Sequence, residues 1–244
     1  MWALQVAAFK ERFKVVLWDF RGHGRSETTE EGYSLEQFVE DERELLCYLG
    51  IETAHVGGLS LGGLVSSWFA ASYPEMTGSL VLSDSAGLLE GMSEQEKESK
   101  RKLFETSAAL AEKEGRAAMA DATVSLMFSE EFIKKAPDLV NKVKEGIIAD
   151  PGQGYARTIR HLLMDFWKKS EDEIKNELAR ISAPAFILAG ELDRLTPLPT
   201  QQALHRSMPG SRFKVIKGAG HVPVLEKPQE WNREVLDFLD NLEN

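Results

Sequence analysis

The sequence predicts an α/β fold with a mostly parallel sheet, helices on both faces and an inserted helical cap. Short apolar runs alternate with helical segments over most of the chain, which is typical of parallel strands buried on both faces. Between residues 88 and 181 these runs stop, and the pattern becomes helical throughout. The 244 residues suffice for one core with such an insertion, so we expect core residues 1–87 and 182–244 around a cap at 88–181.

Five apolar runs are the predicted strands. Valine, leucine, isoleucine and aromatic residues are frequent in most of them, and glycine, proline or polar residues border them. The runs are 14–20, 54–60, 78–85, 184–190 and 212–218. Helical segments separate most successive runs, so the sequence predicts crossover connections and parallel pairing.

Local signals place the helices between these runs. Residues 34–50 begin with a Ser-x-x-Gln capping box, carry apolar residues near one face and end at a glycine, which predicts a crossover helix. Another helix is expected directly after Ser60, and the last is expected to begin at Pro228. In the insertion, Ser-x-x-Glu capping boxes predict helices that begin after Ser93 and Ser170.

Composition and charge restrict the partners. The net charge of −10 and the pI near 5.1 argue against nucleic acid and anionic membranes, which would repel the chain, so we expect a small-molecule substrate. We see no basic leader followed by an apolar run and no stretch of about 18 apolar residues, so we expect a cytoplasmic protein. The single cysteine, Cys47, rules out an internal disulfide and is expected to be buried in a helix.

The segment "GGLSLGG" contains the pattern Gly-x-Ser-x-Gly around Ser60. A predicted strand precedes the serine and a predicted helix follows it, and a sharp turn between the two exposes a serine oxygen at the top of a sheet. Side chains at Gly58 or Gly62 are expected to collide across that turn. We therefore predict that Ser60 is a nucleophile. The alternative is a glycine-rich helix start that binds phosphate or only packs.

A serine nucleophile needs a base and an acid that orients the base. His221 lies in a glycine-rich loop between the last predicted strand and the final helix, and Asp193 follows the preceding strand. These residues are the predicted base and acid, in the chain order Ser, Asp, His. Asp84, which comes after the apolar residues of the run 78–85, is the rival for the acid, with loop capping as its structural explanation.

The other four histidines have structural explanations in a strand, a turn and helical segments. The five histidines show no metal-ligand spacing such as His-Glu-x-x-His, and the sequence contains no phosphate-binding Gly-x-x-x-x-Gly-Lys-[Ser/Thr] motif. The sequence therefore implies no metal and no cofactor.

Together these motifs resemble those of the α/β-hydrolase superfamily, and the resemblance covers nearly the whole chain. "DFRGHGRS" resembles that family's loop after its fourth strand, and "GGLSLGG" resembles its nucleophile turn. "GELDRLTP" resembles its acid loop, and "GAGHVPVLEKP" resembles its histidine loop. Within the superfamily, the chain is most similar to 3-oxoadipate enol-lactonases and related small carboxylesterases. Haloalkane dehalogenases carry aspartate where this chain has Ser60, which excludes that branch.

The resemblance implies a mechanism. Ser60 attacks an ester or lactone carbonyl, His221 passes the proton to the leaving group and then activates water, and Asp193 holds His221. The backbone N–H of Leu61, the residue after the nucleophile, supplies one donor to the oxyanion.

The resemblance also implies that this chain is shortened at its N-terminus. Members of the superfamily begin with two or three further strands and a His-Gly loop that supplies the second oxyanion donor. We therefore expect 14–20 to pair directly with 54–60, and the loop at 20–24 to lend an N–H from a position such as Gly22. A shortened sheet with an exposed edge leaves a monomer and a homodimer as alternatives.

The leading interpretation is a serine hydrolase that cleaves carboxylic esters of small, short-acyl substrates. The first alternative is an enol-lactonase acting on a small dicarboxylic lactone, for which Arg157 or Arg160 could bind the anionic group. The second is a non-catalytic or weakly active binder on the same fold. Three aromatic residues of the cap are candidates for the acyl pocket, with plain core packing as the competing explanation: Phe128, Phe166 and Trp167.

Overall fold

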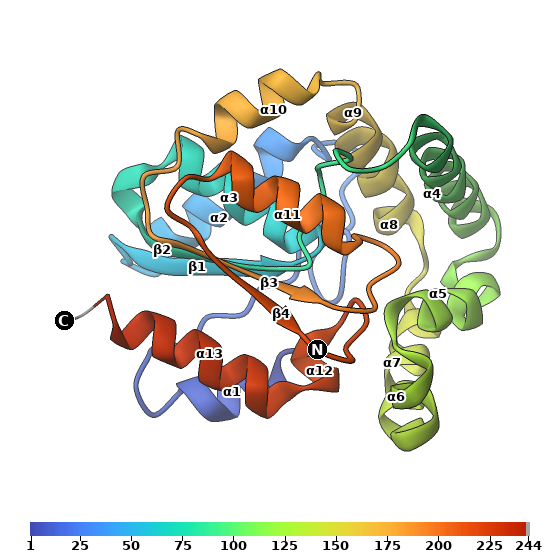
Figure 1. Ribbon diagram of the computed structural model, residues 1–244. Coiled ribbons are helices and arrows are strands. Elements are labelled where there is room, and N and C mark those ends of the chain that lie inside the picture. Colours follow the sequence, from blue (N-terminus) through green and yellow to red (C-terminus); the bar gives the residue numbers. More distant parts are fainter. Residues whose placement is uncertain (243–244) are drawn as a thin grey trace.

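The structure, a computed structural model, describes residues 1–242. Within them, four strands form one parallel sheet in chain order, from β1 to β4 (Figure 1). The strands are β1 (Ala54–Leu59), β2 (Thr77–Ser83), β3 (Ala185–Gly190) and β4 (Arg212–Ile216). They confirm four of the five predicted strands.

The middle of the sheet is its most deeply buried part. Every residue of β3 is buried, and β2 is buried at all but one position, whereas β1 and β4 are partly exposed. Apolar side chains on both faces of the two central strands are expected for parallel strands between layers of helices. Because all four strands run in the same direction, their carboxyl ends meet at one edge of the sheet.

The predicted strand at 14–20 is wrong. These residues all belong to the described part of the chain, yet they lie outside the sheet, and β1 forms its edge. The aromatic side chains of this segment pack elsewhere. The ring of Phe20 lies against that of Phe38 at 5.1 Å, and Trp18 lies against Phe20 at 4.7 Å. None of the residues 14–20 is fully buried, and Leu17 is 55% exposed, so this apolar run did not indicate a buried strand.

Helices cover both faces of the sheet (Figure 1). One face carries α2 (Leu35–Tyr48), α3 (Leu61–Ser72) and α11 (Leu198–Ser207), and the short helix η1 (Pro74–Met76) follows α3. The other face carries α1 (Ala3–Phe9) and α13 (Pro228–Asp240), with the short α12 (Pro223–Glu226) before α13. These helices confirm the ones expected at 34–50, after Ser60 and from Pro228.

Helix α2 agrees with the sequence in part at its N-terminus but not at Cys47. Only half of the predicted capping box is present: the Ser34 hydroxyl accepts the N–H of Gln37 at 3.2 Å, but the Gln37 side chain donates to Asp41 at 3.2 Å. Cys47 lies in this helix, but it is exposed, so the expectation of burial is wrong. The buried face is formed by other positions, namely Leu35, Phe38, Val39, Glu42 and Leu46.

The stretch between β2 and β3 is helical, at the right and top of Figure 1. It contains α4 (Glu94–Glu114), η2 (Arg116–Met119), α5 (Ala120–Met127), α6 (Glu130–Lys135), α7 (Pro137–Ala149), α8 (Gln153–Thr158), η3 (Ile159–Leu163), α9 (Met164–Phe166) and α10 (Glu171–Leu178). Both predicted capping boxes, at Ser93 and Ser170, are present. No helix within residues 1–242 combines the length and apolar character that crossing a membrane requires.

The last helix of this stretch returns to the core. Ile174 and Leu178 of α10 are buried in the same cluster as Leu64 and Trp68 of α3. A second cluster, on the opposite face of the sheet, joins α13 to α5 and α7. The helical stretch therefore packs against the helices on both faces of the sheet. It lies near the edge formed by the carboxyl ends of the strands.

Candidate active site

Ser60 lies at the turn between β1 and α3. Its backbone has φ 54° and ψ −115°, a conformation that a non-glycine residue rarely adopts. Its N–H donates to the Ser83 carbonyl at 3.0 Å, and its own carbonyl accepts the N–H of Ala86 at 2.9 Å. Residues at the end of β2 and in the loop after it therefore hold the turn in this strained form.

Glycines make room for the turn, but not at both positions that the motif suggested. A Cβ at Gly58 would lie 2.3 Å from the backbone carbon of Gly62, so residue 58 cannot carry a side chain. A Cβ at Gly62 would meet no atom of the described residues within 4 Å, so the predicted collision there is wrong. Gly63 is the second restricted position, because its Cβ would lie 2.7 Å from the Oγ of Ser85.

A buried glutamine holds the loop that supports Ser60. Gln201 of α11 accepts the N–H of Ser85 at 3.2 Å and donates to the Ser85 carbonyl at 2.9 Å. Because Ala86 of the same loop donates to Ser60, Gln201 supports the turn through one intervening residue. Sequence reasoning missed Gln201, since nothing local marks a contact between positions 116 residues apart.

Asp193 and His221 meet above the ends of β3 and β4. The imidazole Nδ1 lies 2.8 Å from Oδ2 of Asp193, and both side chains are buried. The other carboxylate oxygen, Oδ1, accepts the N–H groups of Leu195 and Thr196 at 2.7 and 3.1 Å, and the Thr196 hydroxyl lies 2.5 Å from Oδ2. Burial alone would raise the pKa of Asp193, but the imidazole and these donors outweigh it and hold the pKa well below its ordinary value.

Thr196 could have been found from the sequence. An aspartate that accepts backbone and hydroxyl donors two and three residues later forms a familiar local turn. The segment from Asp193 to Thr196 has the required spacing, and Pro197 ends it. This turn fixes the carboxylate from its own loop, before any contact with His221.

The loop that carries His221 is fastened to the cap. The His221 N–H donates to the Met127 carbonyl at 2.8 Å. The buried Glu226 accepts the N–H of Gly220 at 2.8 Å and, from the cap, the N–H and hydroxyl of Ser129 at 3.1 and 2.5 Å. Sequence reasoning also missed Glu226, although it stands within the quoted histidine loop.

Asp84, the rival acid, lies in the same cluster as Asp193 and His221. One ligating atom from each of the three residues lies within 4.8 Å of the others, and all three side chains are buried. Asp84 Oδ1 accepts the N–H of Gly190 at 2.7 Å, and Oδ2 accepts the Ser83 hydroxyl at 3.2 Å. Asp193 is the residue whose carboxylate contacts His221 Nδ1, and the Asp84 carboxyl lies beside that pair.

Ser60 and His221 are not joined in the way that Asp193 and His221 are. Within residues 1–242, no hydrogen bond joins the Ser60 hydroxyl to His221. A ring that donates from Nδ1 to Asp193 carries its lone pair on Nε2, the nitrogen available to take a proton from a hydroxyl. An imidazole oriented in this way can accept a proton at Nε2.

The expected oxyanion donors differ in their availability. Leu61 is the first residue of α3, and the first N–H groups of a helix have no acceptor inside it. By contrast, the Gly22 N–H donates to the Glu27 carbonyl at 2.7 Å, and the His23 N–H donates to the Phe20 carbonyl at 2.9 Å. The hypothesis that Gly22 lends the second donor is therefore wrong, because its own turn uses that N–H.

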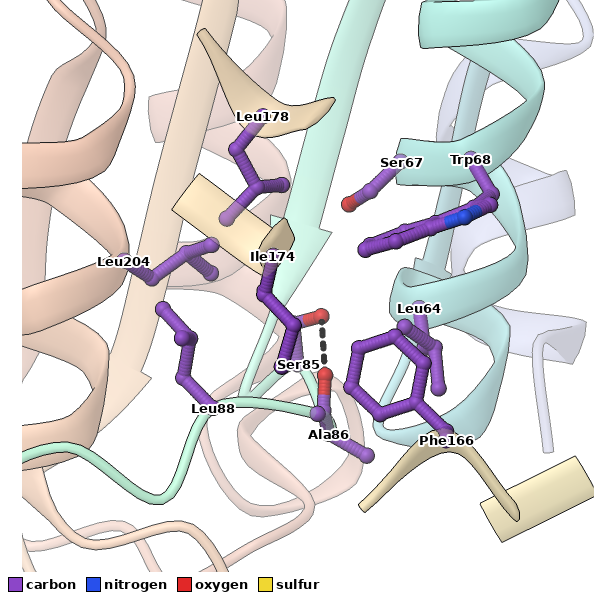
Figure 2. A pocket seen from close by; sticks show the side chains of 11 residues that line it. Leu64, Ser67, Trp68, Ser85, Ala86, Leu88, Phe166, Ile174, Leu178 and Leu204 are labelled. Atoms are coloured by element: carbon purple, nitrogen blue, oxygen red, sulfur yellow. Dashed lines mark hydrogen bonds between the residues drawn. The ribbon is translucent and has the colours of Figure 1, made fainter. Parts of the chain in front are cut away.

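The cap aromatics named from the sequence are buried in packing. Phe166 lies edge-on against Trp68 of α3 at 4.9 Å, Trp167 donates to the Gly87 carbonyl at 3.0 Å, and Phe128 stacks on Phe132. Phe166 lines an apolar cavity of about 10 Å³ together with Trp68 and Ser85 (Figure 2). One water needs about that much space, so this cavity is too small for an acyl chain.

One cation of the cap lies close to the acid loop. Lys100 of α4 donates to the Leu195 carbonyl and lies 5.8 Å from the centre of the Trp167 ring. Burial lowers its pKa to about 8, against the opposing effect of Asp193, and within residues 1–242 it forms no ion pair. Arg157, which donates to the Thr29 carbonyl, and Arg160, which pairs with Glu112 at 2.7 Å, are both engaged elsewhere.

Comparisons with known proteins extend over nearly the whole chain. A family model described as alpha/beta hydrolase fold matches residues 1–228. 3-Oxoadipate enol-lactonase 2 of Acinetobacter baylyi is 28% identical over 235 residues, which cover 96% of this chain and 82% of that protein. The enol-lactonase structure from Burkholderia xenovorans LB400 matches with a TM-score of 0.86 at 26% identity, over 98% of this chain and 85% of the other. A thermophilic esterase from Thermogutta terrifontis matches with a TM-score of 0.85 at 26% identity, over 100% and 85%.

Proposed function

The chain belongs to the alpha/beta hydrolase fold family, and from that premise we propose that it is a serine hydrolase of carboxylic esters with short acyl groups. The observation that carries the proposal is the buried 2.8 Å contact between Asp193 Oδ2 and His221 Nδ1. The parallel sheet supports it, because Ser60, Asp193 and His221 follow β1, β3 and β4 at the same edge. Esterase and enol-lactonase structures among the similar proteins support the same class of reaction.

The proposed reaction has two halves. In the first, His221 Nε2 takes the hydroxyl proton of Ser60 as Oγ attacks the carbonyl carbon, and the imidazolium then gives that proton to the departing alcohol oxygen. In the second, the imidazole takes a proton from water, the hydroxide attacks the acyl-enzyme, and the acid leaves as the proton returns to Ser60. Asp193 stabilises the imidazolium in both halves and keeps the ring in the required tautomer.

Leu61 is the proposed donor to the oxyanion. The N–H of the residue after the nucleophile points toward the developing charge in this type of turn, and its place at the N-terminus of α3 adds the favourable end of the helix dipole. A single oxyanion donor contributes about 10²- to 10³-fold in turnover.

A second candidate function is the hydrolysis of a small lactone that carries a carboxylate. Lys100 of α4 favours this second function. Its side chain has no ion-pair partner in residues 1–242 and donates to the Leu195 carbonyl of the acid loop. The curated relative named above is a 3-oxoadipate enol-lactonase, which supports the same direction. Lys100 replaces Arg157 and Arg160 as the proposed anion-binding residue.

The test compares chromogenic esters on the purified protein. We expect turnover of p-nitrophenyl acetate above that of p-nitrophenyl octanoate, lost in Ser60→Ala and kept in Ser72→Ala, which changes an exposed serine of the same helix. Strong preference for a carboxylate-bearing lactone over both esters would favour the lactonase. Turnover no greater than that of Ser60→Ala would contradict catalysis and favour the non-catalytic binder.

A further inference from the structure

Asp84 is a buried carboxyl that the proposed reaction does not use. It is fully buried at the end of β2, with φ 44°, and its N–H donates to the Leu188 carbonyl of β3 at 2.9 Å. Its carboxyl lies in one cluster with the Asp193 carboxyl and the His221 ring. Two carboxyl groups this close, away from water, cannot both be ionised without strong repulsion.

The hydrogen bonds decide which carboxyl keeps the charge. Asp193 has four donors, which are the N–H groups of Leu195 and Thr196, the Thr196 hydroxyl and the His221 ring. Asp84 has two, from Gly190 and Ser83. Donors stabilise the ionised form, so the negative charge belongs on Asp193 and the proton on Asp84. Burial first, and the charge of Asp193 second, raise the pKa of Asp84 well above its ordinary value.

The hydrogen bonds favour one oxygen of Asp84 for the proton. Oδ1 accepts the Gly190 N–H at 2.7 Å and Oδ2 accepts the Ser83 hydroxyl at the longer distance of 3.2 Å, so Oδ1 is the better carbonyl-type oxygen and Oδ2 the better hydroxyl. The Ser83 hydroxyl beside Oδ2 itself accepts the indole N–H of Trp231 at 3.3 Å. Asp193 is the acceptor in this cluster that carries a full negative charge.

We propose that Asp84 is a positioning residue of the site: a neutral carboxylic acid whose hydroxyl donates to Asp193 and holds that carboxylate against His221. The inference rests on the proposed function, in which His221 is the base. A donor on Asp193 withdraws negative charge from the oxygen that faces the imidazole, so the imidazolium is stabilised less and the ring stays neutral to lower pH. A neutral ring is the form that takes a proton from Ser60.

Few other charges act on this cluster. Asp193 from the loop after β3 and His221 from the loop after β4 face Asp84 directly. Lys100 from α4 acts on Asp193 through its charge. The remaining neighbours named above, Ser83 and Trp231, are neutral. A change in how His221 titrates can therefore be traced to the two carboxyls when Lys100 is left in place.

The first experiment detects the proton itself. The infrared carbonyl band of a protonated carboxyl is measured at neutral pH in the wild-type protein, Asp84→Asn and Asp165→Asn, the last being an exposed control in the cap. Glu42, whose pKa is about 7, also contributes protonated-carboxyl absorption at neutral pH, and neither variant removes that contribution. We expect a further protonated-carboxyl component that is lost in Asp84→Asn and kept in Asp165→Asn. No difference between the wild-type protein and Asp84→Asn would overturn the proposal. This measurement does not depend on a variant that leaves a hole in the core.

The second experiment follows the His221 ring by NMR over pH in the wild-type protein, Asp84→Asn and Asp84→Ala. The asparagine amide still donates to Asp193, so we expect its midpoint within about 0.3 pH of the wild-type midpoint, whereas Asp84→Ala moves the midpoint up by about 0.5 pH or more. An ionised Asp84 predicts the opposite sign, because both substitutions would then remove a negative charge. A downward shift, or no shift in Asp84→Ala, would overturn the proposal.

Kinetics separate this role from simple support of the fold. At neutral pH we expect kcat/KM for p-nitrophenyl acetate to fall about threefold in Asp84→Ala, through kcat and with the acid limb displaced upward, and to recover in Asp84→Asn. An equal loss in both variants would contradict the proposal. The infrared and NMR measurements need no substrate, so they decide the role of Asp84 even where no ester is hydrolysed.

Discussion

At the scale of single residues, burial and the number of donors determine what each acidic side chain does. Asp193, with four donors, keeps its charge in a buried loop. Asp84, with two donors, lies beside it and is the proposed neutral carboxylic acid that donates to Asp193. Glu42 is buried in α2, and its carboxyl group forms no hydrogen bond or ion pair within residues 1–242. The same chemical group is therefore an anion, a donor or a source of instability, depending on its surroundings.

Removal of the charge from Asp193 tests its role in holding His221. Asp193→Asn keeps the shape of the side chain but places an amide where the ring needs an anion. We expect kcat/KM for p-nitrophenyl acetate to fall about 10⁴-fold, with little change in the melting temperature. Steady-state kinetics beside the surface control Asp165→Asn check this. A loss below about tenfold would show that Asp193 is not the acid of the site.

Glu42 makes stability depend on pH. Burial raises its pKa from 4.5 to about 7, so the folded chain retains a proton that the unfolded chain releases. Its contribution to stability is therefore complete below about pH 4.5 and is lost as pH rises through 7, by about 3 kcal/mol. We expect Glu42→Gln to raise the free energy of unfolding at pH 8 and to change it little at pH 4.5.

Urea titrations at both pH values measure this difference. Glu44→Gln, an exposed glutamate of the same helix, is the matched control and should show no such pH dependence. If Glu42→Gln and Glu44→Gln change stability equally at pH 8, the buried carboxyl is not the cause.

At the scale of elements, the cap and the histidine loop are joined by one carboxylate. Glu226 at the end of α12 accepts from Gly220, next to His221, and from Ser129, which also caps α6 by accepting the N–H of Phe132 at 3.2 Å. Burial raises the pKa of Glu226, although these donors oppose the rise. Glu226 therefore links the N-terminus of α6 to the loop that carries His221.

Glu226→Gln should loosen this connection. The amide nitrogen of glutamine cannot accept a hydrogen bond, so the side chain loses its bonds either to Gly220 or to Ser129. We expect faster amide hydrogen exchange at Gly220 and Ser129, and a fall of about tenfold in kcat/KM, with Glu130→Gln on α6 as the exposed control. Unchanged exchange at both amides would refute the connection.

Elements with local signals were predictable from the sequence. The capping boxes at Ser93 and Ser170 and the glycine-flanked turn at Ser60 depend on neighbours within a few residues, and the structure contains them. The strand predicted at 14–20 failed because an apolar run does not show whether a neighbouring strand is there to pair with it: the segment lies outside the sheet, and Leu17 is 55% exposed. The expectation for Cys47 failed because residue type was used in place of position: the buried face of α2 includes Leu46 but not Cys47.

At the scale of the whole molecule, the site is assembled from three loops at one edge of a parallel sheet. This is why the chain order of Ser60, Asp193 and His221 was informative without any distance: each follows a strand, and the strands are parallel. The supporting residues were not predictable in the same way. Gln201 and Glu226 act across distant parts of the chain, and no pattern in the sequence links them to their partners.

The cap contributes a cation to the acid loop, which tests the lactonase alternative. In Lys100→Met, we expect KM for a carboxylate-bearing ester to rise about tenfold, while p-nitrophenyl acetate is unaffected. Because burial lowers the pKa of Lys100 to about 8, the wild-type preference for the anionic substrate should weaken above pH 8 as the ammonium loses its proton. Equal effects of Lys100→Met on both esters would leave Lys100 with a structural role only.

Covalent labelling determines whether Ser60 is the nucleophile. A fluorophosphonate reacts with an activated serine, and peptide mapping by mass spectrometry locates the adduct. We predict one adduct per chain, on Ser60, formed at least about 10²-fold more slowly in His221→Ala and unchanged in Ser72→Ala. An adduct on another residue, no adduct on the folded protein, or labelling that is independent of His221 would contradict this role of Ser60.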